Sequence, residues 1–84
     1  MTELLARTPK QIGNAIRRRR RSLGLQQSAV GKKTSRRQAT ISALEAGEAG
    51  TQLRTLLEVL TALDLELVVR PRTKASIEKI EDLF

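Results

Sequence analysis

The chain has 84 residues, of which 16 are Lys or Arg and 9 are Asp or Glu, and it contains neither cysteine nor histidine. This length supports one small domain with a modest core. The lack of cysteine excludes disulfides and thiolate metal sites, and the lack of histidine removes the commonest residue of neutral-pH acid–base catalysis and of imidazole metal sites. No apolar run is long enough for a membrane span and residues 1–10 do not read as a signal peptide, so a cytoplasmic protein without membrane contact is expected.

The formal net charge of +7 is distributed unevenly along the chain. Residues 1–44 hold eleven Lys or Arg and a single acid, Glu3, whereas residues 45–84 hold five Lys or Arg and eight acids, so the halves carry about +10 and −3. A surface that is merely soluble more often mixes both signs. The asymmetry therefore predicts one end that binds a polyanion and another that binds a different partner.

The first predicted helix begins after Thr8 and runs to about Leu23. Thr8 can cap the helix, Pro9 suits the first helical position, and Gln11 stands where a capping box closes. The residue that follows the helix is Gly24, and glycine commonly ends helices.

Five consecutive arginines, Arg17–Arg21, lie within this helix. They cannot all point in one direction, because each residue turns the helix by about 100°. Arg20 falls next to the apolar edge, whereas Arg17, Arg18 and Arg21 are expected to be solvated. The run is either a simple solvated face or a surface that attracts the phosphates of a nucleic acid.

Two short helices and a tight joint are predicted in the stretch Gln27–Glu45. The first helix covers about 27–33, the joint 34–36 and the second helix about 37–46. Gly31 has no side chain, so the second helix can cross the first closely at this point. This arrangement is a helix-turn-helix.

The second helix of this motif has two different edges. Ile41 and Leu44, three residues apart, form an apolar edge that packs against the first helix. The opposite edge carries hydrogen-bonding side chains, Arg37, Gln38, Thr40 and Ser42. A helix that enters the major groove of DNA needs such side chains to reach the base edges. The edge therefore indicates DNA reading, with a small helical bundle that has a polar outer face as the alternative.

A fourth helix is predicted over about 52–63, with Thr51 as its cap. Its leucines recur at helical spacing and predict a core-facing stripe. These leucines are Leu53, Leu56, Leu57, Leu60 and Leu63.

A short strand is predicted over Glu66–Arg70, which is rich in β-branched residues and is ended by Pro71. The backbone groups of a lone strand need a partner. The simplest partner is the same strand of a second copy, running antiparallel, so the strand predicts a homodimer. The alternative is an extended segment that lies on its own domain.

The chain is expected to divide into a flexible arm over 1–7, a DNA-binding and dimerisation domain over 8–70, and a tail over 71–84. Within the tail, Ser76 can cap a last helix that is too short to be stable alone. The apolar residues Ile80, Leu83 and Phe84 are candidates for contact with a partner protein. Phe84 could instead fold back onto its own domain.

Several short stretches are shared with a known group of proteins. They are Asn14-Ala15, Gly24-Leu25, Gln27-Ser28, Lys32-Lys33, and Gln38–Ser42 with Glu45. In these stretches the chain resembles phage-repressor-type (XRE/Cro) helix-turn-helix proteins over about residues 8–69. Among them it is most similar to HipB-type antitoxins, in the layout of a short strand after the fourth helix and a tail that ends in an aromatic residue.

The resemblance implies an all-α fold, a compact phage-repressor-like helix-turn-helix bundle that dimerises and reads an operator with its third helix. Positions matched one by one give base-reading roles to Arg37, Gln38, Ala39 and Ser42, with weaker roles for Thr40 and Ala43. The short side chains of Ala39 and Ala43 favour apolar contact with a thymine methyl group.

The resemblance also places two residues at the start of the second motif helix against DNA phosphates, and nearby cations add sequence-independent attraction. The expected phosphate contacts are Gln27 and Ser28 in the first group, and Arg17, Arg20, Lys32 and Arg36 in the second. Arg20 and Glu45 also match an ion pair that ties the first helix to the recognition helix in phage repressors.

The function implied by the resemblance is that of a sequence-specific repressor in a HipBA-like toxin–antitoxin operon. As a homodimer on double-stranded operator DNA it would regulate its own operon, and it would neutralise a HipA-like serine/threonine kinase toxin. A stand-alone regulator without a toxin and a protein-binding adaptor are the alternatives. No enzyme and no cofactor are expected, because the sequence shows no nucleophile–base constellation, metal cluster or phosphate-binding loop.

Overall fold

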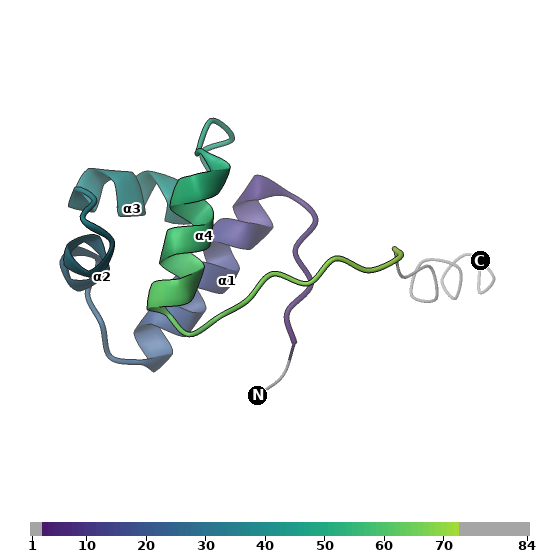
Figure 1. Cartoon of the computed structure of the whole chain (residues 1–84), viewed down its shortest axis with the longest axis horizontal. Coiled ribbons are helices and arrows are strands. Elements are labelled where there is room, and N and C mark those ends of the chain that lie inside the picture. The colour runs from purple at the N-terminus through teal and green to yellow at the C-terminus, as the bar shows by residue number, and fades with distance from the viewer. Residues whose placement is uncertain (1–2, 73–84) are drawn as a thin grey trace.

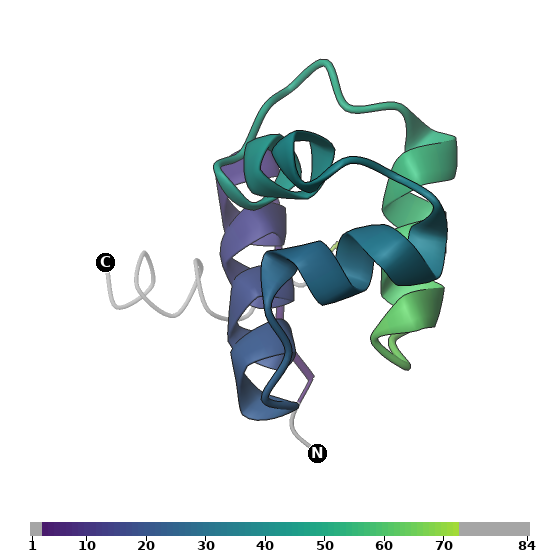
Figure 2. The ribbon, with the colours of Figure 1, turned by 90° about the vertical axis from the view of Figure 1, so that its left-hand side faces the viewer.

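The computed structural model describes residues 3–72, which form four helices (Figure 1). The helices are α1 Pro9–Ser22, α2 Gln27–Thr34, α3 Gln38–Glu45 and α4 Leu53–Ala62. α2 packs on α3 and on α4, and α1 packs on α3. Figure 2 shows α2 and α3 between α1 on one side and α4 on the other. The predicted all-α bundle is confirmed, with each helix within about two residues of its expected bounds.

The core is built from all four helices. Its buried apolar side chains are Ile16, Val30, Ile41, Leu44, Val59, Leu60 and Leu63. The inward edge predicted for the helix-turn-helix is therefore correct. Burial of this apolar surface is the main force that holds four short helices together, because helices of 8 to 14 residues are marginal in isolation.

The start of α1 follows from its sequence. The Thr8 hydroxyl accepts a hydrogen bond from the Gln11 backbone N–H at 3.1 Å, and Pro9 occupies the first turn. The Gln11 side-chain oxygen accepts from the Arg7 backbone N–H at 2.6 Å, one residue before the capping threonine. The helix ends before Gly24, whose φ of +71° suits a residue without a side chain.

The joint between α2 and α3 is closed around Gly31. The C-cap of α2 is Ser35, which has a φ of +57°, and the Arg36 backbone N–H donates to the Gly31 carbonyl at 2.8 Å. A Cβ at Gly31 would lie 2.7 Å from the Arg36 carbonyl oxygen. The prediction was that Gly31 lets the second helix cross closely. The structure shows that it mainly leaves room for the backbone of the joint at Arg36.

The predicted inward stripe of α4 is correct for Leu60 and Leu63, which are buried, and for Leu56, which packs against the core, and it is wrong for the other two leucines. Leu53 and Leu57 are 63% and 42% exposed, because the helix turns a face with Thr55 and Val59 inward. The helix is also not capped by Thr51, whose hydroxyl donates to the Glu48 carbonyl at 3.0 Å, and the N-cap position falls to Gln52. The leucine repeat is compatible with more than one inward face, and the face that is buried depends on how α4 packs against α2.

The strand predicted over Glu66–Arg70 does not form in this chain. Within residues 3–72 no strand is present, and the segment after α4 is extended without regular pairing. It leaves the bundle beside the N-terminal segment (Figure 1), where Arg70 and Glu3 approach to 3.4 Å. One chain offers this segment no neighbouring strand, and a ladder needs a partner on which to form.

The proposed partner-binding residues Ile80, Leu83 and Phe84, and the short helix expected near Ser76, lie outside the described residues. Within the described part of the chain, no helix has the length and apolar character needed to cross a membrane.

Candidate nucleic-acid interface

The polar edge of α3 faces outward. Arg37, Gln38, Ala39 and Ser42 are exposed, and Thr40 and Ala43 are half-buried beside them. Ile41 on the opposite edge is fully buried. Arg37 was expected within the helix and instead occupies the N-cap position with extended backbone angles, so its side chain begins just outside the first turn. The residues predicted to read bases thus lie at the N-cap of α3 and along the side of the helix opposite its buried edge.

A buried ion pair fixes the other end of α3 to α1. The Arg20 Nε and Nη2 atoms donate to the two carboxylate oxygens of Glu45 at 2.6 and 3.0 Å. The Arg20 Nη1 atom donates to the Leu25 carbonyl at 2.8 Å. Arg20 is 8% exposed and Glu45 1%. The predicted ion pair is therefore present, and every guanidinium nitrogen of Arg20 already has a partner within the chain.

The two charges hold one another in the ionised form. Burial by itself raises the pKa of Glu45, but hydrogen bonds from Arg20 and Gln27, with the charges of Arg20 and Arg17, outweigh burial and hold this pKa below its usual 4.5. The hydrogen bond to Glu45 raises the pKa of Arg20 in turn. Arg17 lies at the margin of the pair, with its Nε atom 3.5 Å from the carboxylate of Glu45.

A chain of side-chain amides leads from this pair to the exposed edge. Gln27 at the start of α2 donates its Nε2 to Glu45 at 3.0 Å. The Gln27 Oε1 atom lies 3.5 Å from the Nε2 of Gln38, at the outer limit of a hydrogen bond. Gln27 was predicted to face a phosphate; in the structure its side chain lies between the two ends of α3, with its amide on Glu45 and its oxygen close to Gln38.

The other predicted phosphate contacts fall into two groups. Ser28 and Lys32 are exposed on α2. Arg36, in contrast, is half-buried and donates from Nε and Nη2 to the Glu58 carboxylate at 3.0 and 2.9 Å. Arg20 lies in the core as described. The exposed group is available to a ligand, whereas Arg36 and Arg20 have acidic partners inside the protein.

Sequence reasoning missed two contacts of the arginines. The Arg19 Nε atom donates to the Leu63 carbonyl at 2.9 Å and so caps the end of α4. The bond between Arg36 and Glu58 joins the helix-turn-helix joint to α4. Both contacts link residues 22 or more positions apart. No local pattern signals such partners, which depend on how α4 packs.

A helix pair that is joined by a tight turn, and whose second member turns a polar edge outward from a small helical bundle, defines a helix-turn-helix domain of the DNA-binding type. The family model "Helix-turn-helix" matches residues 16–69. The chain is 35% identical over 74 residues to the antitoxin HipB of Escherichia coli strain K12, which covers 88% of this chain and 84% of that protein. It therefore belongs to the helix-turn-helix family and, within it, to the family of HipB antitoxins.

Solved structures agree with this assignment. A HipB–O4 20mer complex contains a chain that superposes with a TM-score of 0.77 at 32% identity, covering 82% of this chain and 97% of that one. A HipA–HipB–O2–O3 complex gives a TM-score of 0.75 at 30% identity, covering 87% of this chain and 100% of that one. The HipB of Escherichia coli O6:H1 is also 35% identical over 74 residues, covering 88% of this chain and 79% of that protein.

Proposed function

We propose that this chain is a sequence-specific DNA-binding repressor that acts in the cytoplasm as the antitoxin of a kinase toxin similar to HipA. The observation that carries the proposal is the outward polar edge at the start of α3, held in place by the buried pair of Arg20 and Glu45. The HipB relatives, which occur in complexes with an O4 20mer and with HipA and O2–O3, support it.

Base reading falls to the exposed residues of α3. The Gln38 amide can pair in bidentate fashion with an adenine, and the Arg37 guanidinium with a guanine or a phosphate. Ser42, one turn further along, has a hydroxyl that can hydrogen-bond to a donor or to an acceptor on a base edge. Ala39 can contact a thymine methyl group. Half-buried Thr40 and Ala43 take the margins of this surface.

Phosphate contacts supply the sequence-independent part of the affinity. Ser28 and Lys32 on α2 are exposed, and Arg17 of α1 is 39% exposed at its side chain, so these residues can reach the DNA backbone without breaking the core. If a dimer makes about six to ten such contacts, affinity falls by roughly 10³ to 10⁵ between 50 and 200 mM salt.

Dimerisation through the segment Glu66–Arg70 remains part of the proposal. Leu67, Val68 and Val69 are 55%, 62% and 91% exposed in the single chain. Three consecutive exposed apolar side chains on extended backbone favour burial against a second copy. An antiparallel pair of these segments would relate two copies of α3 by a twofold axis and present them to a palindromic operator.

Contact with the kinase toxin is assigned to the acidic half of the chain and the tail residues Ile80, Leu83 and Phe84. Basic and acidic halves would let one protein hold DNA and a protein partner at the same time. This part of the proposal rests on the HipA–HipB complex of the relatives.

A salt-dependent titration tests the DNA-binding proposal. The protein is titrated against a duplex from the region upstream of its own reading frame and against a shuffled duplex, between 50 and 200 mM salt. A steep salt slope on both duplexes, with tighter binding to the first, supports the proposal. A shallow slope and equal affinities would assign the chain to protein-binding adaptors instead.

Co-purification tests the antitoxin role. The chain is expressed together with the protein encoded beside it and isolated through an affinity tag on either one. A stable complex with a kinase supports the proposal. Specific DNA binding without a kinase partner would make the chain a stand-alone regulator.

A further inference from the structure

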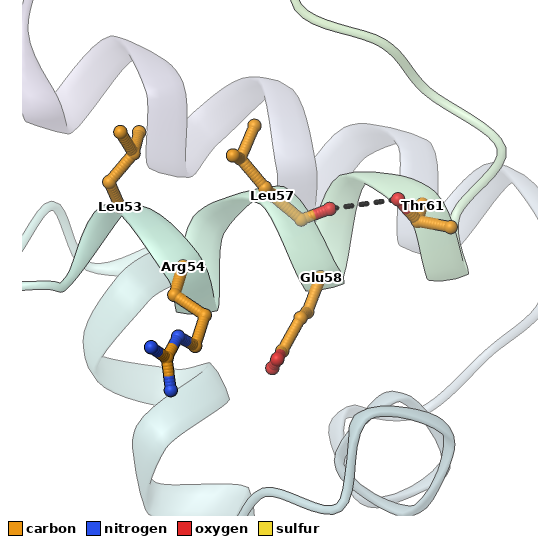
Figure 3. Close-up of a pocket in the computed structure, with 5 residues that line it drawn as sticks. All are labelled: Leu53, Arg54, Leu57, Glu58 and Thr61. Carbon is orange, nitrogen blue, oxygen red and sulfur yellow. Dashed lines mark hydrogen bonds between the residues drawn. The ribbon is translucent and has the colours of Figure 1, made fainter.

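An ion pair at the edge of the proposed DNA surface joins an arginine of the basic half of the chain to a glutamate of the acidic half. Arg36 lies in the joint directly before α3, and its Nε and Nη2 atoms both donate to one carboxylate oxygen of Glu58 on α4. Figure 3 shows the Glu58 side chain leaving α4 on the same side as Arg54, whereas Leu53 and Leu57 leave on the other side. Glu58 therefore reaches toward the helix-turn-helix and away from the apolar surface of α4.

The pair is built differently from the buried pair of Arg20 and Glu45. The side chains of Arg36 and Glu58 are 30% and 40% exposed, against 10% and 0% for the buried pair. A partly solvated pair contributes little to stability and is weakened further by salt. The pair is a small part of what holds the bundle, because Val30 and the other buried apolar side chains form the core and the bond from the Arg36 N–H to the Gly31 carbonyl closes the joint. Arg36 can therefore exchange one anionic partner for another without loss of the fold.

We propose that Glu58 masks Arg36 from the DNA backbone and so sets the sequence-independent affinity of the protein. Arg36 directly precedes Arg37 and the exposed start of α3, where backbone phosphates come close once the helix enters a groove. A phosphate can recruit Arg36 only by displacing Glu58, whose carboxylate is then left facing the polyanion. The inference rests on the proposed DNA-binding function and adds a residue of α4 that limits it.

The test compares Glu58→Gln with the wild-type protein on operator and shuffled duplexes across salt. Removal of the carboxylate frees Arg36 for a phosphate, and one added contact steepens the slope of log K against log salt by about 0.9 per bound chain. The advantage of the variant over the wild type then grows about 3.5-fold per bound chain, or about 12-fold for a dimer, as salt falls from 200 to 50 mM. The gain is the same on both duplexes, because a phosphate contact carries no sequence information.

Three further variants separate masking from a general change in charge. Arg36→Gln costs little affinity in the wild type and several-fold more in the Glu58→Gln background. Asp64→Asn removes the same charge beyond the end of α4, where the Asp64 side chain is 98% exposed and lies 3.9 Å from Arg19, and it leaves the slope unchanged because Arg19 stays bound to the Leu63 carbonyl. Asn tolerates the positive φ of this position.

Three results overturn the inference. A Glu58→Gln variant that matches the wild type in slope and affinity rules out masking, and a steep wild-type slope then leaves the proposed function intact. A gain from Glu58→Gln that is undiminished in the Arg36→Gln background, in affinity and in slope, assigns the effect to net charge alone. A wild-type protein that shows no salt-dependent binding on either duplex overturns the inference and the proposed function together.

Discussion

The substitution Glu45→Gln isolates the charge of the buried pair. Glutamine has nearly the shape of glutamate, so the change leaves no cavity, and its oxygen can still accept one of the bonds from Arg20. What it removes is the negative charge that faces a guanidinium 8% exposed and 2.6 Å away. Removal of one partner from a buried ion pair costs about 3–5 kcal/mol, because the remaining charge stays buried without compensation.

That cost is large for a protein of this size. At roughly 0.05–0.15 kcal/mol per residue, 84 residues give a total stability of about 4–13 kcal/mol. The retained hydrogen bond places the expected loss near the lower end, at about 3 kcal/mol. The variant is therefore expected to unfold at a much lower urea concentration and to populate unfolded chain at moderate temperature.

The measurement is urea unfolding at pH 7, followed by far-ultraviolet circular dichroism. The matched control is Arg17→Gln, which removes a charge 3.5 Å from the same carboxylate but with a side chain 39% exposed, and it should cost less than about 1 kcal/mol. The joint replacement of Arg20 by Met and Glu45 by Leu should recover much of the loss, because no buried charge remains. A loss below about 1 kcal/mol for Glu45→Gln would show that the pair is not buried in solution.

Four other outcomes follow from the structure. The pKa of Glu45 lies below its usual 4.5 in the folded protein, so its contribution to stability is complete above pH 4.5 and is lost as the pH falls through the depressed pKa. The free energy of urea unfolding should therefore fall more between pH 7 and pH 3 for the wild type than for Glu45→Gln. Gln38→Ala should cost about 1–3 kcal/mol on the operator and less on random DNA, measured by fluorescence anisotropy, and an equal loss on both would exclude base reading. Gly31→Ala should lower stability by about 1–3 kcal/mol in urea unfolding, because the new Cβ would lie 2.7 Å from the Arg36 carbonyl oxygen, and an unchanged midpoint would contradict this tight joint. Deletion of Glu66–Arg70 should reduce the dimer fraction in sedimentation velocity, whereas a truncated chain that still sediments as a dimer would refute strand pairing.

Local chemistry explains why much of the fold could be predicted. Thr8, Pro9 and Gln11 specify the start of α1 through backbone groups no more than four residues away. The inward edge of α3 follows from the spacing of Ile41 and Leu44 alone. The pair of Arg20 and Glu45 came from likeness to other proteins, since 25 residues separate its members.

The predictions that failed depend on contacts between distant parts of the chain. The leucine repeat of α4 permits more than one inward face, and packing on α2 selected the one with Thr55 and Val59. The partner of Arg36 lies in α4 and that of Arg19 directly after it. The sequence around either arginine gives no sign of these partners. The predicted strand is a separate case: it is absent from the single chain, and its pairing with a second copy stays a prediction.

The arginine run shows how a formal charge can mislead. Of its five members, Arg20 neutralises a buried carboxylate, Arg19 binds the last turn of another helix, and Arg17 leans toward the same carboxylate as Arg20. Arg19 and Arg20 therefore serve the fold itself, whereas Arg17 approaches Glu45 and still keeps 39% of its side chain exposed. A count of basic residues would overstate how many counterions the protein displaces from a duplex, and two relatives with equal isoelectric points could respond quite differently to ionic strength.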